Sequence, residues 1–255
     1  MNRIELLFKE KKTSILSIYF TAGFPSLNDT VDILLHLENA GVDLIEIGMP
    51  FSDPLADGPV IQESSKQAID NGMTIKLLLA QLQDIRKKTQ IPLVLMGYLN
   101  PILQYGEIAF LEKCREIGID GLILPDMPLD YFKNKLEASF KENGISPILL
   151  ITPETSEERI YQVDHLSNGF LYMVSSNSIT GKNNQLEFQE KYFSRIQKMD
   201  LKNPRLIGFG IRDRETFQRA AAYSQGAIIG TAFIEFLSKE GAKKETIYSF
   251  IKNIQ

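Results

Sequence analysis

The sequence reads Leu44-Ile45-Glu46-Ile47-Gly48-Met49-Pro50-Phe51-Ser52-Asp53-Pro54-Leu55-Ala56-Asp57-Gly58-Pro59 where an apolar run passes into a loop rich in proline and glycine. The run 44–48 is short and nearly continuous, which is typical of a parallel strand covered on both faces. Glu46 interrupts it, and burying an unpaired carboxylate is costly, so such a residue is usually paired, neutralised or used for chemistry. The stretch therefore predicts a buried strand that carries an acidic group toward the loop at its carboxyl end.

Seven further runs have the same apolar, β-rich character. They cover residues 15–20, 93–96, 121–124, 147–151, 170–174, 206–209 and 227–230. Segments with helical spacing lie between them, and this alternation predicts a parallel sheet covered by helices. Eight such units in 255 residues agree with the roughly 250 residues of a (β/α)8 barrel.

We therefore predict an α/β fold, a single (β/α)8 or TIM barrel domain over residues 1–255. Ile4, Leu7 and Phe8 follow a helical repeat before the first strand and predict an extra N-terminal helix. An open, doubly wound sheet is the alternative fold for the same alternation of elements. In a barrel, functional residues follow the strands, because the active site is built from the loops between each strand and the next helix.

Composition excludes several classes of function. With 44% hydrophobic residues and 24% charged residues, the chain can bury a substantial core. A net charge of −4 gives no reason to expect nucleic acid as a partner. The charged N-terminal repeat is unlike a signal peptide and no membrane-length apolar run follows, so we expect a cytoplasmic protein without a membrane partner.

Metal chemistry is poorly supported by the sequence. The single cysteine, Cys114, lies at helical spacing beside apolar residues, which favours a small buried thiol over a ligand. The two histidines, His36 and His165, fall in helical patterns away from any strand end. We therefore expect no metal site.

Two carboxylates are the candidate catalytic groups. Glu46 at the active end of its strand is placed to donate and accept protons near neutral pH if its surroundings are apolar. Asp57 follows in a loop that can fold over the same end of the barrel. The alternative is structural, with Glu46 in a salt bridge inside the barrel and Asp57 as a turn residue. Asp53, between Ser52 and Pro54, is better explained as a turn anchor.

Glycines after the last two strands indicate an anion site. Gly210 follows one strand, and Gly230 and Thr231 follow the other at the start of a helix. Glycines allow close approach of the backbone, and free amides at a helix start bind phosphate, which barrels often hold at this place. Alternatively, the glycines only permit tight corners.

Aromatic residues near strand ends indicate a planar apolar ligand. Phe20, Tyr98 and Phe209 are candidates for a flat pocket, although core packing explains them equally well. Tyr172 is either a core residue or a hydroxyl donor at the barrel mouth. The small, polar residues from 175 to 184 predict a mobile lid.

Taken together, these segments resemble the tryptophan synthase α subunit family across nearly the whole chain. The resemblance is carried by Glu46 to Gln62, Phe20-Thr21-Ala22-Gly23, Met96-Gly97-Tyr98-Leu99-Asn100-Pro101, Leu124-Pro125-Asp126-Met127-Pro128, Thr180-Gly181, Gly208-Phe209-Gly210 and Gly230-Thr231. It implies a lyase of tryptophan biosynthesis that cleaves indole-3-glycerol phosphate to indole and glyceraldehyde 3-phosphate. The family's partner is the β subunit in an α2β2 complex, which carries pyridoxal phosphate, so the resemblance implies no cofactor in this chain.

The resemblance also implies roles for individual residues. Glu46 is the catalytic acid, Asp57 stabilises the charged indole ring, and Tyr172 lies beside both. Thr180 orients Asp57, and a group of four residues holds the phosphate: Gly181, Gly210, Gly230 and Thr231. Residues 175–181 lack an arginine and a glycine that the family commonly has there, which puts closure of the lid in doubt.

Two rival functions stay open at this point. A stand-alone indole-3-glycerol phosphate lyase would share all of these residues and work without a partner. A catalytically silent barrel that regulates a partner enzyme would be favoured by loss of either carboxylate, and both are present.

Overall fold

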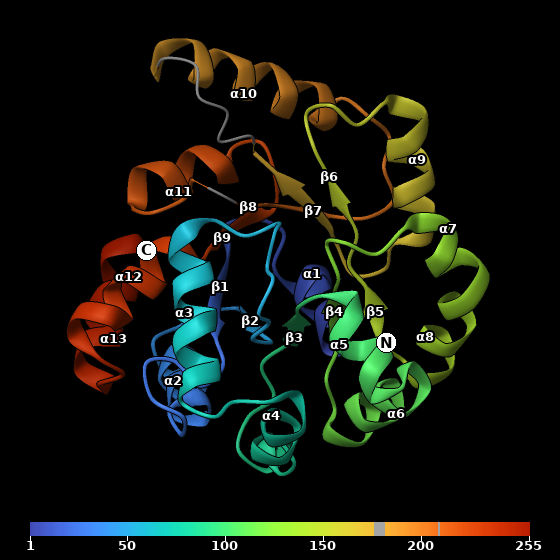
Figure 1. Ribbon diagram of the computed structural model, residues 1–255. Helices are drawn as coiled ribbons and strands as arrows, with labels where there is room; N and C mark the ends of the chain where they lie inside the picture. The colour runs from blue at the N-terminus through green and yellow to red at the C-terminus, as the bar shows by residue number, and fades with distance from the viewer. Residues whose placement is uncertain (176–181, 209) are drawn as a thin grey trace.

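The computed structural model describes residues 1–175, 182–208 and 210–255, and the side chains of 182–189 are outside this description. Within it, strands alternate with helices from one end of the chain to the other (Figure 1). The strands are β1 Ile15–Thr21, β2 Leu44–Gly48, β3 Leu93–Met96, β4 Gly121–Ile123, β5 Ser146–Pro147, β6 Leu150–Ile151, β7 Leu171–Val174, β8 Arg205–Gly208 and β9 Gly226–Ile229.

Every strand pair is parallel, in the order β5-β4-β3-β2-β1-β9-β8-β7-β6. The two ends of this order, β5 and β6, are separated by only Ile148 and Leu149. The amide of Ile148 donates to the carbonyl of Leu122 in β4 (3.1 Å), and the amide of Tyr172 in β7 donates to the carbonyl of Leu149 (3.0 Å). The segment from β5 to β6 is therefore one barrel strand, bonded to both neighbours, and the sheet closes into eight strands.

The predicted (β/α)8 barrel is thus confirmed, and the open sheet is excluded because it would leave two unpaired edges. The predicted strand over 147–151 appears as two short pieces for a physical reason. It pairs with β4 at its beginning and with β7 at its end, so neither ladder runs its full length.

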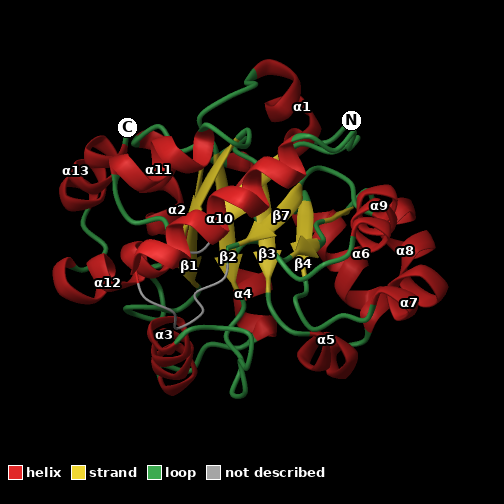
Figure 2. Cartoon of the chain, turned by 90° about the horizontal axis from the view of Figure 1, so that it is seen from above, coloured by secondary structure: helices red, strands yellow, loops and turns green. Residues whose placement is uncertain are grey.

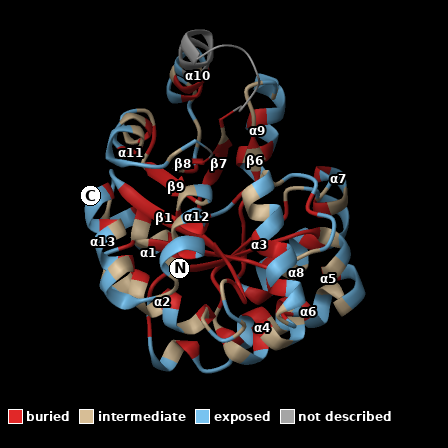
Figure 3. Ribbon diagram, turned by 60° about the vertical axis from the view of Figure 1, so that its left-hand side comes forward, coloured by how far each residue is buried: buried red, intermediate tan, exposed pale blue. Residues whose placement is uncertain are grey.

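Helices enclose the sheet, and Figure 3 shows buried residues along the strands and exposed residues on the outer helix faces. They are α1 Arg3–Glu10, α2 Thr30–Asn39, α3 Pro59–Asp70, α4 Ile75–Gln81, α5 Leu99–Tyr105, α6 Glu107–Ile117, α7 Leu129–Tyr131, α8 Glu137–Asn143, α9 Glu157–Leu166, α10 Lys182–Gln197, α11 Arg214–Ala221, α12 Thr231–Glu240 and α13 Lys244–Ile254, with η1 Ile85–Lys87 and η2 Phe132–Leu136. Among the described residues, no helix is both long and apolar enough to cross a membrane.

The extra N-terminal helix, α1, lies at the amino-terminal end of the barrel, opposite the strand arrowheads (Figure 2). Asn2 caps it and also donates to the carbonyl of Asp120 and the hydroxyl of Ser146. Ile4 is fully buried, and a β-carbon on Gly121 of β4 would lie 3.0 Å from its side chain. This helix therefore closes the amino-terminal end of the barrel and leaves the carboxyl ends of the strands for a site.

Residues that the sequence placed in helices lie there. Cys114 is a fully buried residue of α6, and burial raises the pKa of its thiol, which agrees with the predicted packing role. His36 and His165 lie in α2 and α9.

Candidate active site

Glu46 lies in β2 with its side chain completely buried. The hydroxyl of Ser17 donates a hydrogen bond to its Oε1 (2.8 Å), while Oε2 has no partner among the described residues. Burial raises the pKa of this carboxyl from 4.5 to about 8, and the bond from Ser17 opposes the shift. None of the ion pairs among the described residues includes Glu46. With a pKa of about 8, the carboxyl group of Glu46 is mostly protonated and neutral at pH 7.

Asp57 lies in the loop between β2 and α3, with its side chain partly buried. The hydroxyl of Tyr98 donates to Oδ2 of Asp57 (3.0 Å), and Nε2 of Gln62 donates to its backbone carbonyl (2.9 Å). Burial raises the pKa of Asp57 from 3.8 to about 6, and the bond from Tyr98 partly offsets that effect. At neutral pH this carboxyl is largely ionised, in contrast with Glu46.

Two tyrosines face both carboxylates. Tyr19 of β1 is paired in register with Glu46, so the two side chains share one face of the sheet. Tyr172 of β7 lies on the same interior. Burial raises the pKa of each hydroxyl, with smaller contributions from the charges of Asp57 and Glu46. Both rings and the carboxyl group of Asp57 line one cavity, whereas Glu46 is fully buried and is not among the described residues that line it.

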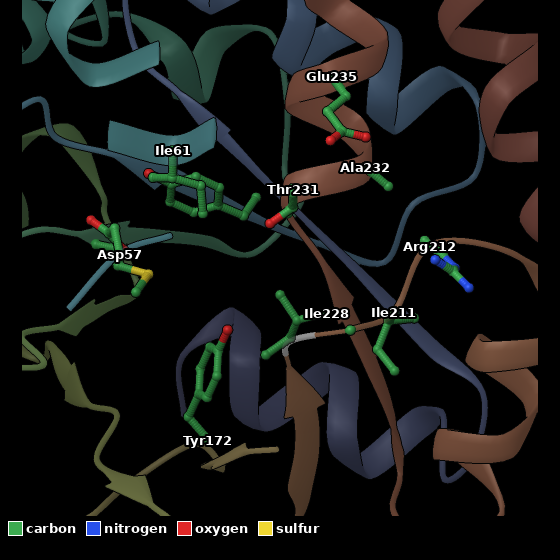
Figure 4. A pocket seen from close by; sticks show the side chains of 13 residues that line it. Asp57, Ile61, Tyr172, Ile211, Arg212, Ile228, Thr231, Ala232 and Glu235 are labelled. Atoms are coloured by element: carbon green, nitrogen blue, oxygen red, sulfur yellow. The ribbon is translucent and has the colours of Figure 1, made fainter. Parts of the chain in front are cut away.

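A cavity of about 260 Å³ opens at the carboxyl ends of the strands (Figure 4). Its lining comes from strands, loops and two helices, α3 and α12, that are distant in the sequence: Tyr19, Asp57, Ile61, Met96, Tyr172, Gly210, Ile211, Arg212, Ile228, Gly230, Thr231, Ala232 and Glu235. In Figure 4, Tyr172 and Asp57 lie at one end of the cavity, and Thr231, at the start of α12, lies between them and Arg212. Arg212 belongs to the loop after β8. This is the end at which barrels carry their active sites.

The predicted anion residues meet at this cavity. Gly210 has φ +74, a conformation that glycine adopts without strain. Gly230 is the N-cap of α12 and Thr231 is its first residue, so the first amides of the helix adjoin the cavity. The structure therefore brings together two strand ends that the sequence separates by 20 residues, from 210 to 230. Thr180, Gly181 and Phe209 lie outside the described residues.

Two predicted aromatic residues are placed differently from the expectation. Phe20 is fully buried and alternates with Tyr19, so it points to the opposite face of β1, toward the helices. Tyr98 does not line the cavity. Its hydroxyl bonds Asp57 and accepts from the amide of Ala56 (3.0 Å), and its ring packs against Phe51 at 5.2 Å between centroids. Tyr98 positions the Asp57 loop, and Tyr19 supplies the aromatic wall assigned to Phe20.

Several lining residues were missed from the sequence. For Tyr19 the sequence held a partial signal, because strand alternation puts Tyr19 and Phe20 on opposite faces of β1. The register against β2, which the structure supplies, decides that Tyr19 shares the face of Glu46. Arg212 and Glu235 had no such signal, since an arginine in a loop and a glutamate in a helix are common on any surface. Among the described residues, no group of three or more His, Cys, Asp and Glu side chains is arranged to hold a metal ion.

Two carboxyl groups of different pKa beside a cavity at this end of a closed barrel are typical of a (β/α)8-barrel enzyme. Comparison with known proteins narrows the class. Residues 6–254 match the family described as Tryptophan synthase alpha chain. The chain is 56% identical, over 100% of both chains, to the Tryptophan synthase alpha chain of Flavobacterium psychrophilum.

Solved structures give the same result. Tryptophan synthase subunit alpha from Legionella pneumophila superposes with a TM-score of 0.88 at 34% identity, over 100% of this chain and 97% of that one. A tryptophan synthase complex from Pyrococcus furiosus gives a TM-score of 0.84 at 30% identity, over 95% and 98%. The chain therefore belongs to the tryptophan synthase alpha chain family. It is a lyase of tryptophan biosynthesis, of the class that cleaves indole-3-glycerol phosphate.

Proposed function

We propose that Glu46 and Asp57 catalyse the retro-aldol cleavage of indole-3-glycerol phosphate to indole and glyceraldehyde 3-phosphate in this chain. The observation that carries the proposal is the contrast between the two carboxyl groups. Burial keeps Glu46 protonated near neutral pH, whereas Asp57 is partly exposed and largely ionised. Two groups whose pKa values differ in this way can divide the acid and the electrostatic roles of one reaction.

The reaction needs a site that accepts the electrons of the breaking carbon–carbon bond. Glu46 donates its proton to C3 of the indole ring, which gives the ring iminium character. The carboxylate of Glu46 then accepts the proton of the substrate hydroxyl. The bond between C3 and the glycerol carbon breaks, its electron pair returns to the ring, and an aldehyde forms. Glu46 ends with a proton, as it began.

Asp57 has the complementary role. Its carboxylate accepts a hydrogen bond from the indole N–H, and this bond strengthens as the ring becomes positive. Tyr98 holds the carboxylate in place through its hydroxyl. Tyr172 and Tyr19 both line the cavity in which we place the ring. From the resemblance to the family, we also assign Thr180 to orient Asp57 and Phe209 to lie near the indole.

The remaining residues hold the phosphate. We place it at Gly210, Gly230 and Thr231, with Gly181 completing the group, because a helix start with adjacent glycines offers free amides and a favourable dipole. The substrate's own ring is the electron sink, so the proposal requires no cofactor in this chain. Pyridoxal phosphate belongs to the proposed partner, the β subunit of a cytoplasmic α2β2 complex, a partner consistent with the match to the Pyrococcus furiosus complex.

The test measures indole release from indole-3-glycerol phosphate by the wild type and by Glu46→Gln and Asp57→Asn. Each variant should lower kcat by about 10²- to 10⁴-fold, the usual effect of removing a general acid or an equivalent charge. Asp53→Asn is the matched control, since it removes an exposed carboxylate from the same loop and should keep wild-type turnover. A near-wild-type rate in either of the first two variants would falsify that residue's role.

A further inference from the structure

The described wall of the cavity is short of positive charge. Its charged side chains are Asp57, Arg212 and Glu235, so Arg212 is the one cation among the described lining residues. The whole chain carries a formal net charge of −4. A phosphate monoester brings a further charge of between about −1.5 and −2 at pH 7. The ligand therefore meets like charges unless a cation lies near its phosphate.

Arg212 is positioned to meet that need. It lies two residues after Gly210, on the loop that leaves β8, and the first turn of α12 borders the same cavity (Figure 4). Its side chain is 77% exposed, and its ion pair with Asp213 is 3.7 Å long with both partners largely in solvent. Such pairs contribute little, so the guanidinium can exchange Asp213 for a ligand at small cost.

Glu235 has the opposite effect. It lies one helical turn after Thr231, and its carboxylate borders the cavity. A carboxylate there disfavours a phosphate bound at the helix start, whereas a guanidinium offers paired N–H donors that match phosphate oxygens. The two side chains therefore act on the same ligand group with opposite sign.

We propose that Arg212 binds the substrate phosphate directly, in addition to the backbone amides, and so determines selectivity for phosphorylated over neutral ligands. Glu235 sets the level of that selectivity by opposing it. This inference rests on the proposed function for the identity of the ligand. It concerns binding and leaves the proton transfers of Glu46 and Asp57 unchanged.

Arg212→Ala should raise KM for indole-3-glycerol phosphate about 10-fold with kcat unchanged, because the variant loses one charge-assisted contact to the phosphate. A 10-fold change corresponds to about 1.4 kcal/mol of binding free energy. By isothermal titration, glycerol 3-phosphate should bind about 10-fold more weakly, whereas neutral indole should bind as it does to the wild type. Glu235→Gln should tighten glycerol 3-phosphate binding, and Arg212→Lys should restore part of the loss.

Arg214→Ala is the matched control. It removes the same charge at the first residue of α11, where the guanidinium bonds the carbonyl of Lys252 instead of lining the cavity. Equal losses of glycerol 3-phosphate affinity in the two alanine variants would overturn the proposal, because a general field effect would then explain both. A fall in kcat at unchanged KM for Arg212→Ala would also overturn it. Failure of the proposed function appears separately, as a wild type that binds glycerol 3-phosphate but releases no indole.

Discussion

At the level of single residues, burial rather than charge pairing controls the two carboxyl groups. Desolvation is the largest cause of both shifts, which raise the pKa of Glu46 to about 8 and that of Asp57 to about 6. The proposed mechanism requires Glu46 to be protonated and Asp57 to be ionised. Glu46 carries its proton below pH about 8, and Asp57 loses its proton above pH about 6.

The pH dependence of kcat/KM should therefore be bell-shaped, rising near pH 6 and falling near pH 8. Stopped-flow or steady-state assays of indole release from roughly pH 5 to pH 9.5 cover both the acidic and the alkaline limb of this pH profile. The substrate phosphate also titrates at about pH 6, so the residual activity of Asp57→Asn serves as the control. If the acidic limb persists in that variant, it belongs to the phosphate, and Asp57 has a different role.

At the level of elements, the strand ends are shaped around the two tyrosines. Gly48 ends β2 and Gly208 ends β8, and a β-carbon on either would overlap the ring and hydroxyl of a tyrosine, Tyr19 over Gly48 and Tyr172 over Gly208. Each glycine thus makes room for an aromatic side chain that comes from another strand. The strand-end glycines of this barrel serve the site as well as the turns.

Gly208→Ala should leave the barrel folded but displace Tyr172, lowering kcat/KM about 10-fold, a loss of about 1.4 kcal/mol of transition-state binding. Circular dichroism checks the fold and indole release checks the rate. The double variant Gly208→Ala with Tyr172→Ala tests the cause. If the steric conflict with Tyr172 is responsible, the double variant is no slower than Tyr172→Ala alone, whereas additive losses would contradict the explanation.

Helix α1 contributes stability at the end of the barrel remote from the site. Ile4 is fully buried there, so Ile4→Ala should lower the free energy of unfolding by about 2 to 5 kcal/mol. Urea unfolding measures the change. Leu6→Ala on the same helix removes a side chain that is 37% exposed and should stay within about 0.5 kcal/mol of the wild type.

The rate of indole release at saturating substrate should be unchanged by Ile4→Ala, because the cavity lies at the opposite strand ends. A loss of turnover in folded Ile4→Ala protein would mean that α1 acts on the site as well as on stability.

At the level of the whole molecule, the end of the barrel that holds the cavity also presents an apolar contact. Leu55 is 90% exposed, two residues before Asp57 in the loop after β2. A single exposed leucine is ordinary on a protein surface, so its place in the same loop as Asp57 is what makes it a useful probe of partner binding. From the family resemblance, we expect the β subunit to dock on residues 50–54 of this loop and on Asn100-Pro101 at the start of α5, and Leu55 directly follows the first of these segments.

We expect the β subunit to raise the rate of indole release by this chain, because docking would order the loop that carries Asp57 and remove an entropic cost from each turnover. The measurement titrates β subunit into the α chain at saturating indole-3-glycerol phosphate. Leu55→Ser should weaken the activation, whereas Tyr248→Ser, which changes an exposed residue of α13, should not. A rate that is already high without β would favour the stand-alone lyase.

Much of this molecule was predictable from its sequence, because the relevant signals are local. Continuous apolar runs separated by helical repeats specify parallel strands covered on both faces, wherever the strands finally lie. Glu46 was conspicuous because a buried, unpaired carboxylate is costly. Its complete burial confirms that the run 44–48 is an interior strand. That residues 1–255 form one domain stays a prediction.

Tertiary structure decided which side chains meet. Phe20 and Tyr19 are adjacent in sequence, and only the register of β1 against β2 puts Tyr19 rather than Phe20 beside Glu46.

The same holds for Tyr98, Arg212 and Glu235. Their functions depend on which loops the closed barrel brings to one end, and that arrangement results from pairing between strands far apart in the chain. Local sequence therefore determined which elements form and which residues are chemically unusual. Closure of the sheet decided which of them share a cavity, because contacts across the barrel arise from long-range strand pairing and leave no periodic signal in the chain.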